Sequence, residues 1–141
     1  MSASQRAQIV SVAERAYPQE CCGLLIGRDE ADSTIVVTRI VESRNIRTDR
    51  ARDRFEIDPQ VRISIEREVR DGTDRVIGHF HSHPDHPAQP SATDLEMAFE
   101  PDLIWVIVGI AGGELDAFNA FRLDRESRTF TSVTIRGDQE P

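Results

Sequence analysis

The sequence predicts an α/β fold in which helices flank a mixed, curved β-sheet on both sides. Short apolar runs rich in β-branched residues are typical of strands, and polar turns separate them. Between these runs lie stretches whose apolar residues recur at helical spacing. The chain has 141 residues, of which 38% are hydrophobic and 30% charged. That length leaves room for one hydrophobic core, so we expect a single domain over residues 1–141.

The N-terminal half of the chain is expected to contain two helices. Apolar residues at i, i+3, i+4 and i+7 predict the first helix, which Pro18 ends because the residue before a proline avoids helical geometry. Asp58 and Pro59 are typical of the N-cap and the first position of the second helix. The expected elements in this half are the helix 4–17, the strands 23–27, 34–41 and 55–57, and the helix 59–70.

The C-terminal half is expected to complete the sheet around a short helix. The run 103–110 is almost entirely apolar, which is typical of a strand buried on both faces. Pro101 ends the preceding helix, and the polar residues 124–128 predict a turn. The expected elements are the strand 75–82, the helix 92–100 and the strands 103–110, 114–123 and 129–136.

All four histidines lie between residues 79 and 86. Side chains alternate between the faces of a strand, so His81 and His83 point the same way and provide half of a zinc site. Pro84 ends the strand, and Ser91 begins a helix whose first turn contains Asp94. Asp94 is therefore the expected third ligand, with a fourth position left open for water.

Other interpretations of these residues stay open. Ser91 and Asp94 also fit a helix N-cap with an acid in the first turn, which requires no metal. His79 shares the parity of the other two histidines, but four residues along a strand span roughly 13 Å. We expect His79 to pack near the site, where it or Ser82 could support a ligand, and His86 to lie in a loop.

The adjacent cysteines are expected to be buried thiols, with a redox role as the alternative. Neighbouring residues of a strand point to opposite faces, so a bridge between Cys21 and Cys22 would strain the chain. Their spacing does not match that of a zinc site either.

The spacing of the polar residues resembles a known signature. His81-x-His83, seven residues, Ser91, two residues and Asp94 resemble the H-x-H-x7-S-x2-D signature of the JAMM, or MPN-plus, metalloproteases. An upstream segment resembles the part of these proteases that contains a glutamate, and Glu20 lies at the position of that glutamate. The resemblance implies the cytidine-deaminase-like MPN/JAMM fold and a Zn2+ ion bound by the two histidines and the aspartate. It implies proton transfer by the glutamate and stabilisation of the oxyanion by the serine.

The resemblance also implies a function. A compact chain with this motif is similar to the small prokaryotic members, which process the C-terminal Gly-Gly tail of ubiquitin-like or sulfur-carrier proteins. We therefore expect a zinc-dependent metallopeptidase or isopeptidase, with the bond to lysine, to cysteine or to a C-terminal extension left open. The alternatives are a non-catalytic MPN scaffold, which generally lacks the ligands, and a RadC-like relative, whose usual DNA-associated N-terminal region has no counterpart here.

The charge and hydropathy of the sequence argue against some classes of partner. The net charge of −8 argues against nucleic acid, and no run is apolar enough for a membrane span or a signal peptide. We expect a cytoplasmic protein, and the oligomeric state stays open. Residues 42–54 hold five arginines and three acids, which fits a solvated loop or a flap that meets an acidic partner. An extended peptide is expected to add to a sheet edge beside the metal strand.

Overall fold

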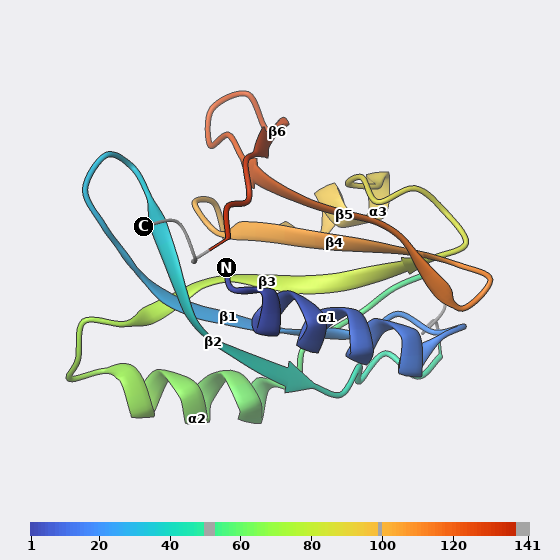
Figure 1. Ribbon diagram of the computed structural model, residues 1–141, viewed down its shortest axis with the longest axis horizontal. Coiled ribbons are helices and arrows are strands. Elements are labelled where there is room, and N and C mark those ends of the chain that lie inside the picture. The colour runs from blue at the N-terminus through green and yellow to red at the C-terminus, as the bar shows by residue number, and fades with distance from the viewer. Residues whose placement is uncertain (50–52, 99, 138–141) are drawn as a thin grey trace.

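The computed structural model describes residues 1–49, 53–98 and 100–137 (Figure 1). Six strands form one sheet in the order β2-β1-β3-β4-β5-β6. β3 and β4 are parallel and the other neighbouring pairs are antiparallel, so the sheet is mixed as predicted. The elements in chain order are α1 (Ala3–Ala16), β1 (Cys22–Asp29), β2 (Ile35–Ser43), α2 (Pro59–Val69), β3 (Arg75–Pro84), α3 (Ala92–Glu96), β4 (Ile104–Ala111), β5 (Glu114–Leu123) and β6 (Phe130–Val133).

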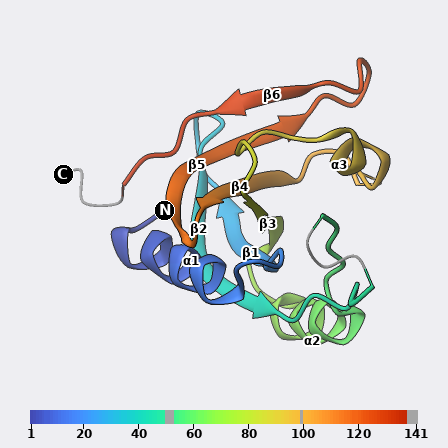
Figure 2. The same ribbon diagram turned by 90° about the vertical axis from the view of Figure 1, so that its right-hand side faces the viewer.

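Helices cover both faces of the sheet, which confirms the predicted fold class. α1 lies against one face, and α2 and α3 lie on the other (Figure 2). On the α1 face, Ile9 and Val12 pack with inward-facing strand residues such as Phe80. On the opposite face, Ile65 of α2 packs with Leu24 in one cluster, and the residues near α3 form another. None of the helices in the described part of the chain is both long and apolar enough to span a membrane.

The largest differences between the structure and the predicted elements lie at three places. Residues 55–57 form no strand: Ile57 makes an isolated bridge to Asn45, because the Asn45 side chain, not a neighbouring strand, holds this segment. α3 ends at Glu96, not at residue 100, since the Met97 N–H closes the last turn by donating to the carbonyls of the preceding turn. Phe99, which the prediction placed in this helix, lies outside the described residues. β6 is Phe130–Val133, since only these residues pair with β5.

The close approach of β3 to β4 gives a test of the sheet. A Cβ added at Gly78 would lie 2.1 Å from the carbonyl oxygen of Ile104 on the parallel neighbour. Gly78→Ala should therefore lower the free energy of unfolding by about 1–3 kcal/mol, as overpacking does elsewhere. Chemical denaturation of the two proteins measures this. Gly72→Ala is the control, because the nearest atom to its added Cβ is 3.8 Å away. An equal loss in both variants would contradict the prediction.

Candidate metal centre

Three buried side chains converge where β3 ends and α3 begins. The Nε2 atoms of His81 and His83 lie 3.2 Å apart. Asp94 places Oδ1 3.2 Å from Nε2 of His81 and Oδ2 3.1 Å from Nε2 of His83. Among the residues that the structure describes, these three form the group whose ligand atoms all lie within 4.8 Å of one another. The sequence predicted this trio from strand parity and the helix start.

Local structure places each member of this group. The alternation of β3 directs both imidazoles to the face covered by α2 and α3, while Ser82 between them points to the other face. A reciprocal capping box starts α3: Ser91 Oγ accepts from the Asp94 N–H at 3.0 Å, and the Ser91 N–H donates to Asp94 Oδ2 at 2.9 Å. Capping and a carboxylate aimed at the histidines therefore coexist, and neither interpretation of Ser91 and Asp94 excludes the other.

The geometry fits a small tetrahedral cation. Nitrogen and oxygen ligands about 2.0–2.1 Å from a tetrahedral zinc ion lie roughly 3.3 Å from each other. The three separations in this group are 3.1–3.2 Å. The Nδ1 of His83 donates to the Pro87 carbonyl at 2.7 Å, which directs its Nε2 towards Asp94 and towards a bound metal. The residues could hold a divalent ion with one coordination position left open.

The charges at the centre favour a bound cation. Burial alone would raise the pKa of Asp94, but the charge of His81, the hydrogen bonds from both imidazoles and the Ser91 N–H together hold it well below its usual range. Burial lowers the pKa of His81, and Asp94 opposes that shift. Asp94 is therefore an anion, and the two imidazoles beside it provide neutral nitrogen donors when a metal replaces their protons.

Glu20 lies two residues before β1, close enough for the charge of Asp94 to act on its carboxyl group. Its side chain is buried, and within the described residues its Oε1 has no hydrogen-bond partner. Burial raises the pKa of Glu20 to about 9, and the negative charges of Asp94 and Asp53 add to that effect. Most buried polar atoms are paired, so a buried carboxylate oxygen without a protein partner is typical of a functional site.

An aromatic wall encloses the histidines. The ring of Phe55 stacks on His81 at 4.2 Å between centroids, and Trp105 meets His79 edge-on at 4.4 Å. Burial and the neighbouring His81 lower the pKa of His79 to about 3, so this residue is a neutral packed group. Phe55 was predicted only as part of a strand. No sequence signal linked it to the metal group, whereas Trp105, the only tryptophan, lies in the predicted buried strand.

The remaining predicted residues have structural positions. Cys21 and Cys22 are free, buried and on opposite faces, and burial raises their pKa values to about 11 and about 12. These values favour the thiols, so the expectation of buried thiols is confirmed. His86 lies in an exposed loop, with its ring 4.7 Å from that of His83. Ser82 points to the other face of β3, where its hydroxyl accepts from the Cys21 N–H at 2.8 Å, so it does not face the two imidazoles.

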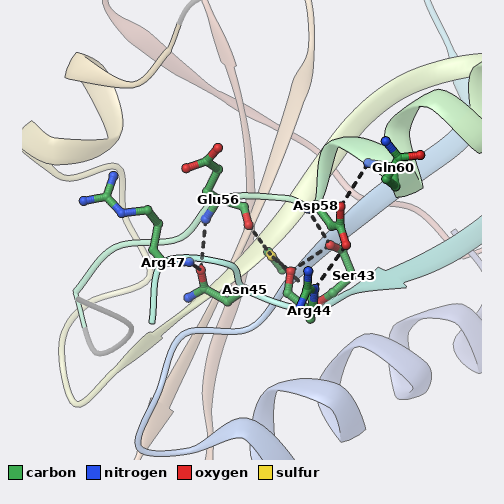
Figure 3. Close-up of polar contacts among 8 residues, drawn as sticks. Ser43, Arg44, Asn45, Arg47, Glu56, Asp58 and Gln60 are labelled. Atoms are coloured by element: carbon green, nitrogen blue, oxygen red, sulfur yellow. Dashed lines mark hydrogen bonds and ion pairs between the residues drawn. The ribbon is translucent and has the colours of Figure 1, made fainter. Parts of the chain in front are cut away.

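The arginine-containing loop after β2 is anchored by polar contacts at its base (Figure 3). Arg44 forms an ion pair with the N-cap residue Asp58 at 3.1 Å. Asn45 Oδ1 accepts from the backbone N–H groups of Arg47 and Glu56 at 3.0 Å each. Arg50 and Arg52, which belong to the predicted flap, lie outside the described residues.

Comparison with known proteins identifies the family. Residues 2–124 match the model of prokaryotic homologs of the JAB domain, and the chain belongs to this family. The crystal structure of a JAB1/MPN domain protein from Archaeoglobus fulgidus superposes with a TM-score of 0.60 at 19% identity, covering 96% of this chain and 95% of that one. The fold that the JAMM resemblance implied is thereby confirmed.

Two relatives of known activity align with most of the chain. A desampylase from Haloferax volcanii is 32% identical over 111 residues, which are 76% of this chain and 77% of the relative. A CysO-cysteine peptidase from Mycobacterium bovis is 27% identical over 115 residues, which are 82% of this chain and 75% of the relative. Both relatives are thus similar to this chain over the part that contains the metal group.

The buried Glu20 gives a pH-dependent prediction for the metal-free protein. Unfolded glutamate ionises near pH 4.5, whereas folded Glu20 ionises near pH 9. Between these values the unfolded state loses the proton first, so stability falls as pH rises. Glu20→Gln removes this penalty, and at pH 7 its free energy of unfolding should exceed that of the wild type by up to about 3 kcal/mol.

Urea denaturation after chelation, from pH 4 to pH 8, measures this difference between the variants. The gap should close towards pH 4, where glutamate is protonated in both states. Glu96→Gln is the control, because Glu96 is exposed on the short helix α3. A gap between Glu20→Gln and the wild type that stayed constant with pH would disprove the assignment of the shift to Glu20.

Proposed function

We propose that the protein is a zinc-dependent metallopeptidase that hydrolyses the amide bond after the C-terminal Gly-Gly tail of a ubiquitin-like or sulfur-carrier protein. The observation that carries the proposal is the convergence of His81, His83 and Asp94 at tetrahedral spacing, with Glu20 buried beside them. The relatives named desampylase and CysO-cysteine peptidase favour this substrate class over a general peptidase.

Zinc fits the donor set of two imidazoles and one carboxylate. When bound by His81, His83 and Asp94 with one open position, zinc lowers the pKa of water to about 7 and polarises a carbonyl. The Pro87 carbonyl and the Ser91 N–H orient two of these ligands through the hydrogen bonds described above.

Glu20 transfers the proton in the proposed reaction. Its carboxylate accepts a proton from the attacking water as the water oxygen bonds to the scissile carbonyl carbon. The same proton then passes to the leaving nitrogen when the C–N bond breaks, which yields a free amine and a glycine carboxylic acid. The acid releases the second proton of the water to solvent and becomes a carboxylate. A positive charge at the metal group would lower the pKa of Glu20, against the burial and the charges of Asp94 and Asp53 that raise it, and would thus favour the ionised form.

In the proposed reaction Ser91 stabilises the oxyanion. Its Oγ accepts from the Asp94 N–H, and a hydroxyl that accepts one hydrogen bond keeps its own proton for donation. A preorganised donor at the carbonyl oxygen contributes about 3–4 kcal/mol in a well-studied enzyme.

The approach to the site differs from the sequence-based prediction. β3 has strand neighbours on both sides, and the sheet edges are β2 and β6, so a peptide cannot add to an edge of the metal strand as predicted. A cavity of about 300 Å³ borders His79 and Phe55 instead, between the loop after β2 and the segment that follows α3. We infer that the tail reaches the metal group along this cavity, where glycines have no side chain to clash with the walls.

The rival functions predict different metal contents and substrates. A non-catalytic scaffold would bind no zinc at this site, whereas a RadC-like relative would bind metal without acting on a Gly-Gly tail.

It stays a prediction that the protein is one domain, is cytoplasmic, and has no nucleic-acid or membrane partner.

Metal analysis of variants tests the proposed ligands. The purified protein should contain about one zinc per chain, and His83→Ala should lose it because a ligand is removed. Glu20→Gln should keep the zinc and lose turnover, since glutamine cannot accept a proton. Elemental analysis and a cleavage assay on the same samples measure both. Full zinc occupancy in Asp94→Ala would exclude this ligand set, and near-normal turnover in Glu20→Gln would remove Glu20 from the mechanism.

A pair of matched conjugates tests the substrate. A sulfur-carrier protein that ends in Gly-Gly and is joined to a lysine or a cysteine should be cleaved, whereas its counterpart ending in Ala-Ala should be cleaved at least tenfold more slowly. Gel separation of the products gives kcat/KM for each conjugate, and the Glu20→Gln variant controls for contaminating proteases. Equal cleavage of the two conjugates would overturn the tail assignment, and rapid hydrolysis of unrelated short peptides would point to a general peptidase.

A further inference from the structure

Asn45 uses its whole hydrogen-bonding capacity on backbone groups. Its Nδ2 donates to the carbonyl oxygens of Glu20 at 3.2 Å and Arg54 at 2.9 Å. Its Oδ1 accepts the N–H groups of Arg47 and Glu56, as Figure 3 shows. A carboxamide has two N–H donors and two acceptor positions, so all four are occupied.

These contacts connect the loop after β2 to Glu20, which lies two residues before β1. The backbone N–H of Arg47 lies at one end of the loop, and the backbone groups of Arg54 and Glu56 lie at the other. Asn45 therefore joins the two ends of the loop at its base. The fourth contact goes to the backbone of Glu20, 25 positions earlier in the chain. One side chain therefore ties the arginine-containing loop to the residue with the buried carboxylate.

The contact with Glu20 forms one half of a clamp on a single peptide group. The Glu20 carbonyl accepts from Asn45, and the N–H of the same peptide, which belongs to Cys21, donates to Ser82 Oγ at 2.8 Å. Ser82 lies on β3 between the two ligand histidines. Because the peptide group is planar, holding it at both ends fixes its plane and the position of the Glu20 Cα, from which the side chain starts.

We propose that Asn45 is a positioning residue that clamps the Glu20–Cys21 peptide against the metal strand and couples the placement of Glu20 to closure of the loop base. Its catalytic consequence rests on the proposed function. A misplacement of about 1 Å at a catalytic group costs on the order of a hundredfold in rate.

Two substitutions separate the clamp from simple loop closure. Asn45→Ala removes all four hydrogen bonds. Asn45→Asp keeps an acceptor for the N–H groups of Arg47 and Glu56, but a carboxylate cannot donate to the carbonyls of Glu20 and Arg54. The control is Thr38→Val, which removes hydroxyl hydrogen bonds to Asp74 and to the Ile26 carbonyl at a site on β2 that does not contact Glu20.

The kinetic test uses zinc-loaded proteins and the Gly-Gly conjugate. We expect kcat to fall about ten- to a hundredfold in both Asn45 variants, with zinc content equal to that of the wild type. Thr38→Val should lower the unfolding midpoint and leave kcat within twofold of the wild type. A kcat within twofold of the wild type in Asn45→Asp would overturn the proposal, and so would a loss of zinc that accounts for the lost turnover.

A second measurement does not depend on turnover. Hydrogen exchange followed by NMR should show the Cys21 amide exchanging at least tenfold faster in Asn45→Ala than in the wild type, with no such change in Thr38→Val. Unchanged exchange at Cys21 in Asn45→Ala would overturn the clamp. If the wild type cleaves none of the conjugates, the proposed function fails, while the exchange measurement still decides whether Asn45 holds the peptide.

Discussion

The structure depends on one electrostatic constraint: two imidazole nitrogens and a carboxylate held about 3.2 Å apart in a buried place. In the absence of a cation, the nitrogens of His81 and His83 compete for the few protons that can lie between them and Asp94. A small cation satisfies all three groups at once. The central position of β3, the short helix α3 and the aromatic wall all serve to keep these atoms together.

The main apolar core and the metal group lie on opposite faces of the sheet. The largest apolar cluster lies on the α1 face and runs from Ile9 across the central strands to Phe118. The other face has two smaller clusters, one under α2 and one beside α3. The metal group lies between these two clusters, so its polar and charged side chains lie outside the main apolar core.

How much could be predicted from the sequence depended on whether the signal was local. The period of a strand and the cap of a helix are local properties, so His81, His83 and Asp94 followed from spacing, and the resemblance added Glu20. Phe55 and Asn45 reach the site only when a polar loop without periodicity folds back on the sheet. Their positions depend on tertiary contacts that the local sequence does not reveal. For the same reason residues 55–57 were wrongly predicted as a strand.

The position of the metal strand in the sheet has a consequence for assembly. Outer strands expose unpaired N–H and C=O groups, and these are where a second chain can extend a sheet. Here the outer strands are β2 and β6; β1 lies between β2 and β3, and β4 and β5 lie between β6 and β3. A second chain joined at either edge would not pair with the metal strand. Association through an edge of the sheet would therefore leave the backbone pairing of the metal strand unchanged.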